Sequence, residues 1–138
     1  VGCAICWDQW FPEAARLTAM QGAELLFYPT AIAWDDNEDE SVYQDQLSAW
    51  KTIMRSHAIA NNVFVVAVNR VGREGHLNFW GNSFVVDPFG KELYSDAVDE
   101  AVTSLEIDLS QIEEARKIWP FFRDRRTDLY SNLEKSWS

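Results

Sequence analysis

The sequence has 138 residues, a formal net charge of −10, and a hydrophobic fraction of 47%, with 14% aromatic residues. This composition predicts a globular core and excludes a disordered chain, and the length fits one domain or part of one. The negative charge argues against nucleic acid or an anionic membrane surface as a partner and favours a cationic small molecule.

The first half of the sequence predicts alternating strands and helices. The expected elements are a strand at residues 1–6, a helix from Pro12 to Gly22, a strand at 24–28, an acidic loop at 30–41 and a helix at 42–61. Pro12 suits the first helical turn because its missing N–H costs nothing there, and Gly22 suits a helix end. In the long helix, Trp50 and Met54 belong to an apolar face with a period near 3.6 residues.

The second half predicts further strands, one short helix and a tail. The expected elements are a strand at residues 63–68, a hairpin of strands 82–86 and 92–95 around a turn at 87–90, a last strand at 101–107, and a helix that Ser110 caps with Glu113. The run at 63–68 is continuously apolar, which is typical of a strand buried on both faces. The order indicates a mixed, layered α/β domain, in which residues 119–138 form an extended C-terminal tail.

Cys6 is the first candidate for chemistry. It lies where the first expected strand approaches a helix, a place that can expose a nucleophile on a sharp turn. Backbone N–H groups after such a turn can bind an oxyanion, and a helix N-terminus favours the thiolate. A single cysteine in a strand is more often buried and inert. Cys3 and Cys6 also form a C-x-x-C, but strand residues three apart point to opposite faces, which argues against a disulfide or a zinc site.

Histidines and an acidic loop are weaker candidates. We expect His57, within the long helix, to be structural, and His76, in a polar loop, has no evident partner for a Cys–His pair. The acidic loop contains Asp35 and Asp36. A solvated surface explains such a loop, although its position after a strand end also suits a carboxylate that receives a substrate ammonium group.

Residues 1–13, VGCAICWDQWFPE, resemble the nucleophile motif of the nitrilase superfamily, in which an aromatic residue, an acid and then Phe-Pro-Glu follow the cysteine. The similarity continues through FYPTAI at 27–32, AVNRVG at 67–72, GNSF at 81–84 and FFRDRR at 121–126. Within the superfamily, YPTAI and RDRR look most like the N-carbamoylputrescine amidases. The resemblance selects Cys6 over Cys3 as the nucleophile.

The resemblance implies the C-terminal half of an α-β-β-α sandwich that hydrolyses a linear amide without a metal or organic cofactor. The family's catalytic Glu and Lys would lie upstream of this sequence, so the isolated chain is expected to be inactive. A homo-oligomer is also expected. The implied site consists of Cys6 as nucleophile, the backbone N–H of Trp7 as oxyanion donor, and Thr30, Ala31, Trp34 and Asp35 as substrate-binding residues.

Three alternatives remain open at this point. The substrate could be another amide, such as an ω-amide or a carbamoyl amino acid, for which an Arg facing the pocket is expected instead of Asp35. The chain could be a non-catalytic interaction subunit. A redox or metal protein built on Cys3 and Cys6 is the third alternative, and the spacing disfavours it.

The sequence also predicts a cytoplasmic location. Two cysteines are too few for a disulfide scaffold and suit a reducing compartment. No apolar run approaches the ~20 residues that a membrane span needs, and no secretory signal pattern opens the sequence. Val1 stands inside an expected strand, which we interpret as the start of a part of a longer polypeptide.

Overall fold

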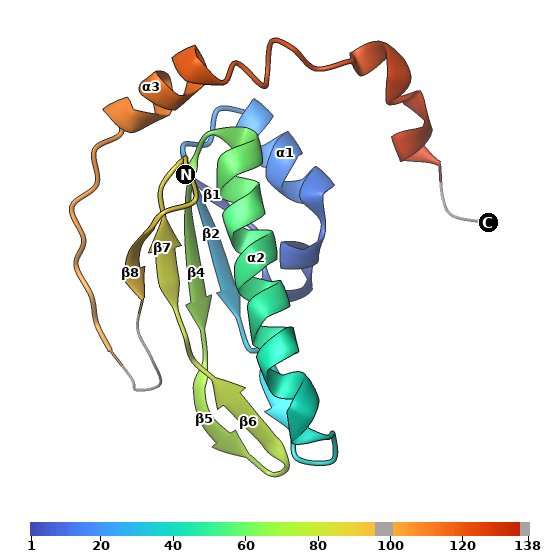
Figure 1. Cartoon of the computed structure of the whole chain (residues 1–138), viewed down its shortest axis with the longest axis vertical. Coiled ribbons are helices and arrows are strands. Elements are labelled where there is room, and N and C mark those ends of the chain that lie inside the picture. The colour runs from blue at the N-terminus through green and yellow to red at the C-terminus, as the bar shows by residue number, and fades with distance from the viewer. Residues whose placement is uncertain (96–100, 136–138) are drawn as a thin grey trace.

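A five-stranded mixed sheet forms the centre of the structure, and two helices cover one of its faces (Figure 1). The computed structural model describes residues 1–95 and 101–135. The strands are β1 (Gly2–Cys3), β2 (Leu25–Thr30), β4 (Phe64–Asn69), β7 (Phe84–Val86) and β8 (Glu92–Ser95). Their order is β1-β2-β4-β7-β8; the first three are parallel, and β7 and β8 add antiparallel.

The helices confirm most of the expected positions. They are α1 (Pro12–Met20), α2 (Tyr43–Asn61) and α3 (Ser110–Ile118), with the 3₁₀ turns η1 (Cys6–Trp10), η2 (Glu40–Val42), η3 (Thr127–Leu129) and η4 (Ser131–Glu134). Pro12 is the first residue of α1, as predicted. Asn62 ends α2 in the left-handed conformation, at φ 47°. Asparagine tolerates this conformation better than most residues, which explains the break there.

A second, smaller sheet was not predicted. It consists of β3 (Ala33–Asp35), β6 (Leu77–Trp80) and β5 (Val71–Glu74), paired antiparallel in that order. It continues from one end of the main sheet (Figure 1). The expected loop at 30–41 is therefore wrong over β3. This strand has only three residues, and its partners in β6 lie 42 to 46 positions away, so local patterning gives no signal for it.

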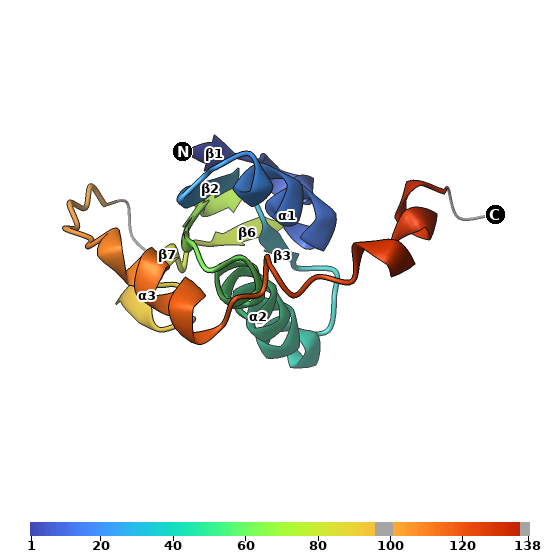
Figure 2. The same ribbon diagram turned by 90° about the horizontal axis from the view of Figure 1, so that it is seen from above.

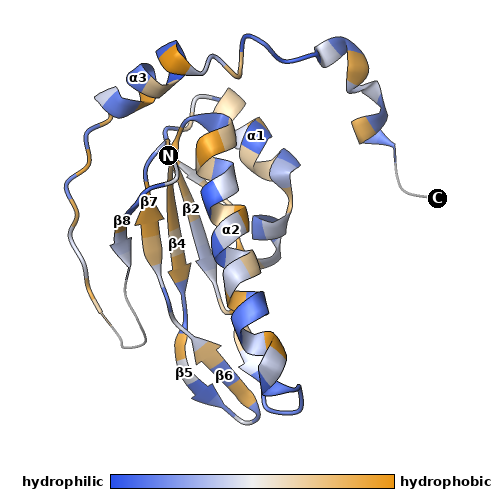
Figure 3. Cartoon of the chain, viewed as in Figure 1, coloured by the Kyte–Doolittle hydropathy of each residue, from blue (hydrophilic) through white to orange (hydrophobic). Residues whose placement is uncertain are grey.

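The core fills the space between the two helices and the main sheet. Trp50 and Met54 of α2 have no exposed surface, and they pack with the inward-facing residues Val65 and Ala67 of β4. The opposite face of β4 is less covered, and Val68 is 46% exposed. The expected burial on both faces therefore holds at Phe64, which is 0% exposed, and is wrong at Val68. Figure 3 shows that β4 is hydrophobic along its length although helices cover only one side.

Residues 101–108 run without regular secondary structure along the face of the sheet that α1 and α2 leave free (Figures 1 and 2). They form no strand, so the strand expected at 101–107 is wrong. The alternation was informative nevertheless, because Thr103, Leu105 and Ile107 face the sheet. The expected Ser110 cap is also wrong: Ser110 is the first residue of α3, and its N–H donates to Asp108 Oδ1 at 2.9 Å.

After α3 the chain passes the C-terminal end of α2 and runs beside α1 (Figure 2). The Arg16 guanidinium of α1 lies 4.8 Å from the centroid of the Phe122 ring. The division into a domain and a tail from residue 119 stays a prediction, and residues 136–138 of that tail lie outside the described part. Within residues 1–95 and 101–135, no helix is both long enough and apolar enough to cross a membrane.

Candidate active site

Cys6 lies on a sharp turn between the main sheet and α1. β1 ends at Cys3, shorter than the strand expected at 1–6, and Cys6 opens the 3₁₀ turn η1 that leads to Pro12. Its φ of 52° is left-handed. This conformation costs a non-glycine residue about 1–2 kcal/mol, so neighbouring contacts must hold it. Both cysteines are free thiols, with Cys3 exposed and Cys6 half-buried.

Hydrogen-bonding groups of three residues act on the Cys6 sulfur. The Thr30 hydroxyl at the end of β2 donates to Sγ at 3.5 Å. The backbone N–H groups of Ala31 and Trp7 also help to lower the pKa of this thiol. The Thr30 hydrogen bond, followed by that of Ala31, lowers the pKa of the Cys6 thiol, while partial burial and the Asp8 carboxylate oppose this effect. The arrangement favours the thiolate, the nucleophilic form.

Gln9 connects this sulfur site to the core. Its side chain is buried, with Nε2 donating to Thr30 Oγ1 at 3.2 Å and Oε1 accepting from Trp50 Nε1 at 2.7 Å. Its backbone carbonyl lies 2.8 Å from His57 Nε2. His57 is buried, as expected for a structural residue, and burial lowers its pKa. Sequence reasoning missed Gln9 and treated Trp50 as a core residue only, because 41 positions separate the two.

Asn69, at the end of β4, holds the segment after Thr30. Its Oδ1 accepts from the Ile32 N–H at 2.9 Å, and its Nδ2 donates to the carbonyls of Ile32 and Gly81, each at 3.1 Å. Ile32 is adjacent to Ala31, so this clamp fixes the backbone that presents the Ala31 N–H. Sequence reasoning missed Asn69 as well.

Trp34 and Asp35 lie farther along, on β3. The Trp34 ring stacks on Tyr43 with centroids 5.1 Å apart. Asp35 Oδ1 accepts from the backbone and side-chain N–H groups of Asn37, which lower the pKa of this carboxyl, and Oδ2 lies 3.6 Å from His76 Nε2. His76 therefore lies beside a carboxylate, a contact that the sequence did not predict. The structure brings Trp7, Thr30 and Ala31 to the sulfur. Trp34 and Asp35 instead contact β6 and the start of α2.

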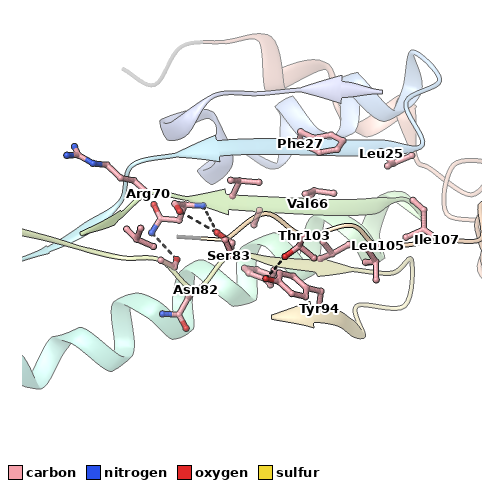
Figure 4. Close-up of a pocket in the computed structure, with 18 residues that line it drawn as sticks. Leu25, Phe27, Val66, Arg70, Asn82, Ser83, Tyr94, Thr103, Leu105 and Ile107 are labelled. Carbon is pink, nitrogen blue, oxygen red and sulfur yellow. Dashed lines mark hydrogen bonds between the residues drawn. The ribbon is translucent and has the colours of Figure 1, made fainter. Parts of the chain in front are cut away.

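A second feature is a hollow of about 760 Å³ on the face of the main sheet opposite α2 (Figure 4). Leu25, Phe27 and Val66 form its floor, and residues from 101–107 border it. Thr103 donates to the Tyr94 hydroxyl at 2.8 Å at this border. The hollow contains none of the expected site residues and is mostly apolar, so it is a free sheet face and not the place of the cysteine chemistry.

Comparison with known proteins identifies the family. The sequence model of the family described as carbon-nitrogen hydrolase matches residues 1–117. The chain belongs to the carbon–nitrogen hydrolase family. Two relatives illustrate the match: the N-carbamoylputrescine amidase of Arabidopsis thaliana is 46% identical over 96% of this chain and 46% of its own length. The citrullinase of Francisella tularensis is 37% identical over 99% of this chain and 49% of its own. The chain thus spans about half the length of these relatives.

Solved structures of carbon–nitrogen hydrolases confirm the fold. The enzyme of Helicobacter pylori G27 superposes with a TM-score of 0.95 at 44% identity, over 99% of this chain and 49% of that one. A mutant amidase of Nesterenkonia sp. AN1, with the acetamide moiety of fluoroacetamide covalently added at its active-site cysteine, gives 0.70 at 28% identity over 94% and 42%. The predicted half of a nitrilase-type α/β fold, with a mixed sheet and flanking helices, is therefore correct.

Proposed function

We propose that this chain carries the nucleophile of a hydrolase that cleaves a linear carbon–nitrogen bond, and that the nucleophile is Cys6. The observation that carries the proposal is the Thr30 hydroxyl that donates to Cys6 Sγ at 3.5 Å, on a thiol whose pKa the backbone amides of Ala31 and Trp7 also lower. Such donors stabilise a thiolate before attack and an oxyanion during it. The cysteine adduct of the Nesterenkonia amidase supports this role by analogy.

The reaction proceeds in two displacement steps. The Cys6 thiolate attacks the amide or ureido carbon, and the carbonyl oxygen takes the negative charge beside the N–H of Trp7. The C–N bond then breaks, the departing nitrogen takes a proton to leave as an amine, and the acyl or carbamoyl group remains on sulfur as a thioester. Water attacks this thioester and restores the thiol. With a ureido substrate the released carbamic acid gives carbon dioxide and ammonia.

The proton transfers need a general base that we expect from upstream of Cys6. The two histidines are engaged elsewhere: His57 bonds to the Gln9 carbonyl and His76 lies beside Asp35. The resemblance assigns the general base to a Glu upstream of Cys6 and the support of the oxyanion to an upstream Lys, and the relatives are about twice as long as this chain. The same upstream half would cover the open sheet face, whose apolar residues border the hollow.

N-carbamoylputrescine is the substrate that we propose first. Its far end is an ammonium group, and the net charge of −10 favours a cationic ligand. Asp35 offers the receiving carboxylate, which the Asn37 N–H groups keep ionised. The name of the Arabidopsis relative agrees with this choice.

A ureido amino acid is the second candidate. It requires a cation for the substrate carboxylate, and Arg73 of β5 pairs with Asp36 in the acidic loop, next to Asp35. The Francisella relative is named a citrullinase, an enzyme for such a substrate. Comparing turnover of N-carbamoylputrescine and citrulline decides between the two. A homo-oligomer and a cytoplasmic location stay predictions.

The test measures ammonia release by three proteins: the 138-residue chain, the same chain joined to the upstream half of the Helicobacter pylori relative, and the joined form with Cys6→Ala. We expect activity in the joined form only, with complete loss in the Ala variant. Cys3→Ala is the matched control, since Cys3 is the other free thiol. Activity that survives Cys6→Ala refutes the proposal, and a joined form that cleaves neither amide nor nitrile favours the interaction-subunit alternative.

A further inference from the structure

Three hydrogen bonds in series link a core tryptophan to the candidate nucleophile. Trp50 Nε1 lies 2.7 Å from Gln9 Oε1, Gln9 Nε2 lies 3.2 Å from Thr30 Oγ1, and Thr30 Oγ1 lies 3.5 Å from Cys6 Sγ. We infer that Trp50 and Gln9 are positioning residues that fix the direction of the hydrogen bond from Thr30 to Cys6. The catalytic meaning of this inference rests on the proposed role of Cys6, although the hydrogen-bond chain itself does not.

The direction follows from what each group can donate. An indole N–H only donates, so the Gln9 atom that faces Trp50 must be the amide oxygen. The amide then turns its NH₂ group toward Thr30, whose oxygen accepts that bond. The single hydroxyl hydrogen of Thr30 is left for the sulfur. Replacing Trp50 by a ring without N–H would allow the amide to turn over and accept the Thr30 hydrogen itself.

Burial keeps the series in one arrangement. Trp50 is 0% exposed and Gln9 1%, so water does not compete for their polar groups. His57 bonds to the Gln9 carbonyl and fixes the backbone of η1 at the same point. Trp50 is held in turn by Phe84, with ring centroids 5.2 Å apart. The rigid core thereby determines the direction in which the Thr30 hydroxyl donates its hydrogen.

The consequence is a bias toward the thiolate. A hydrogen bond donated to the charged form of a group favours that form. The Thr30 hydroxyl is the strongest influence that lowers the pKa of Cys6. Asp8 is the charged group that acts on Cys6 among the described residues, and it opposes ionisation. Asp8 is unchanged in every variant below, so a shift must come from the hydrogen-bond series.

The experiment is the pH dependence of iodoacetamide alkylation of Cys6, measured on the 138-residue chain and on the chain joined to an upstream half. Thr30→Val removes the donor. At a pH below the titration midpoint of Cys6, it should lower the fraction of thiolate, and with it the alkylation rate, by about tenfold or more. Trp50 and Gln9 do not contact the sulfur, yet Trp50→Phe and Gln9→Leu should each lower the thiolate fraction of Cys6 roughly two- to fivefold. Thr30→Ser keeps a hydroxyl and should restore the wild-type midpoint.

Matched controls separate this effect from loss of packing. Thr18→Val removes a hydroxyl that bonds only to the Ala14 carbonyl, and Trp80→Phe removes an indole N–H that has no partner among the described residues. Neither should move the Cys6 midpoint. Cys3, read by mass spectrometry in the same sample, is an internal reference whose alkylation should stay constant in all variants.

Wild-type midpoints in Trp50→Phe and Gln9→Leu, with native near-UV circular dichroism, overturn the inference. If one of these variants unfolds, the other still gives the answer, since each breaks a different bond of the series. Alkylation needs no amide turnover, so the two proposals fail separately. If the midpoints shift but the joined form has no hydrolase activity, the positioning role stands and the proposed function is refuted. If hydrolase activity is present and is lost in Cys6→Ala, but the midpoints do not shift, the proposed function stands and the positioning role is refuted.

Discussion

Asn69 should contribute more to stability than its single side chain suggests. Its amide makes three hydrogen bonds, to the N–H and carbonyl of Ile32 and to the carbonyl of Gly81, and the residue is only 6% exposed. A hydrogen bond contributes about 0.5–1.5 kcal/mol net, so Asn69→Ala should lower the free energy of unfolding by about 2–4 kcal/mol. The upper end applies if no water enters to replace the amide.

Urea unfolding followed by near-UV circular dichroism measures this loss. Asn37→Ala is the control, because that amide is exposed and bonds to Asp35 at the surface; it should change the free energy by less than about 0.5 kcal/mol. Asn69→Ala should also slow alkylation of Cys6, since the clamp at Ile32 fixes the Ala31 N–H. A loss below about 0.5 kcal/mol for Asn69→Ala would show that the loop is held by other contacts and would refute this reasoning.

Two further predictions concern stability. Gly90 has a φ of 77°, and a Cβ added there would lie 2.6 Å from Ile59 Cδ1. Gly75 is the control, because its φ is 59° and an added Cβ would have no atom within 4 Å. Gly90→Ala should therefore lower the melting temperature clearly more than Gly75→Ala. Burial lowers the pKa of His57, so the unfolded chain binds the proton first. Stability should therefore be constant at neutral pH and fall as the pH drops from about 6.5 to about 5, above the range in which carboxyl groups titrate. Urea midpoints over this window test the assignment. A wild-type midpoint that does not change, or an equal fall in His57→Gln, would contradict it.

Local signals in the sequence explain what was predictable. Pro12 marks the start of α1, and Asn62 marks the end of α2, because each residue has a backbone preference that acts without distant partners. The turn at 87–90 also follows from its own residues, since Asp87 Oδ1 accepts from the N–H groups of Phe89 and Lys91. Cys6 itself was found through its motif, and the turn that presents it is a local feature.

Contacts between distant residues explain what was missed. Trp50 bonds to Gln9 across 41 positions, and Asn69 reaches Ile32 across 37. A single sequence does not show which polar residue meets which in a buried layer. The strand expected at 101–107 has the right alternation, but a strand also needs backbone pairing with a neighbour, and in the described structure this segment lies against the face of the sheet instead.

The left-handed backbone at Cys6 has an evolutionary consequence. A glycine or an asparagine would adopt a φ of 52° at lower cost than a cysteine does. Mutation under selection for folding alone would therefore drift away from cysteine at this position. A library of this chain sorted only for expression should lose the thiol, and one sorted for turnover should keep it, so the residue found at position 6 records which pressure acted.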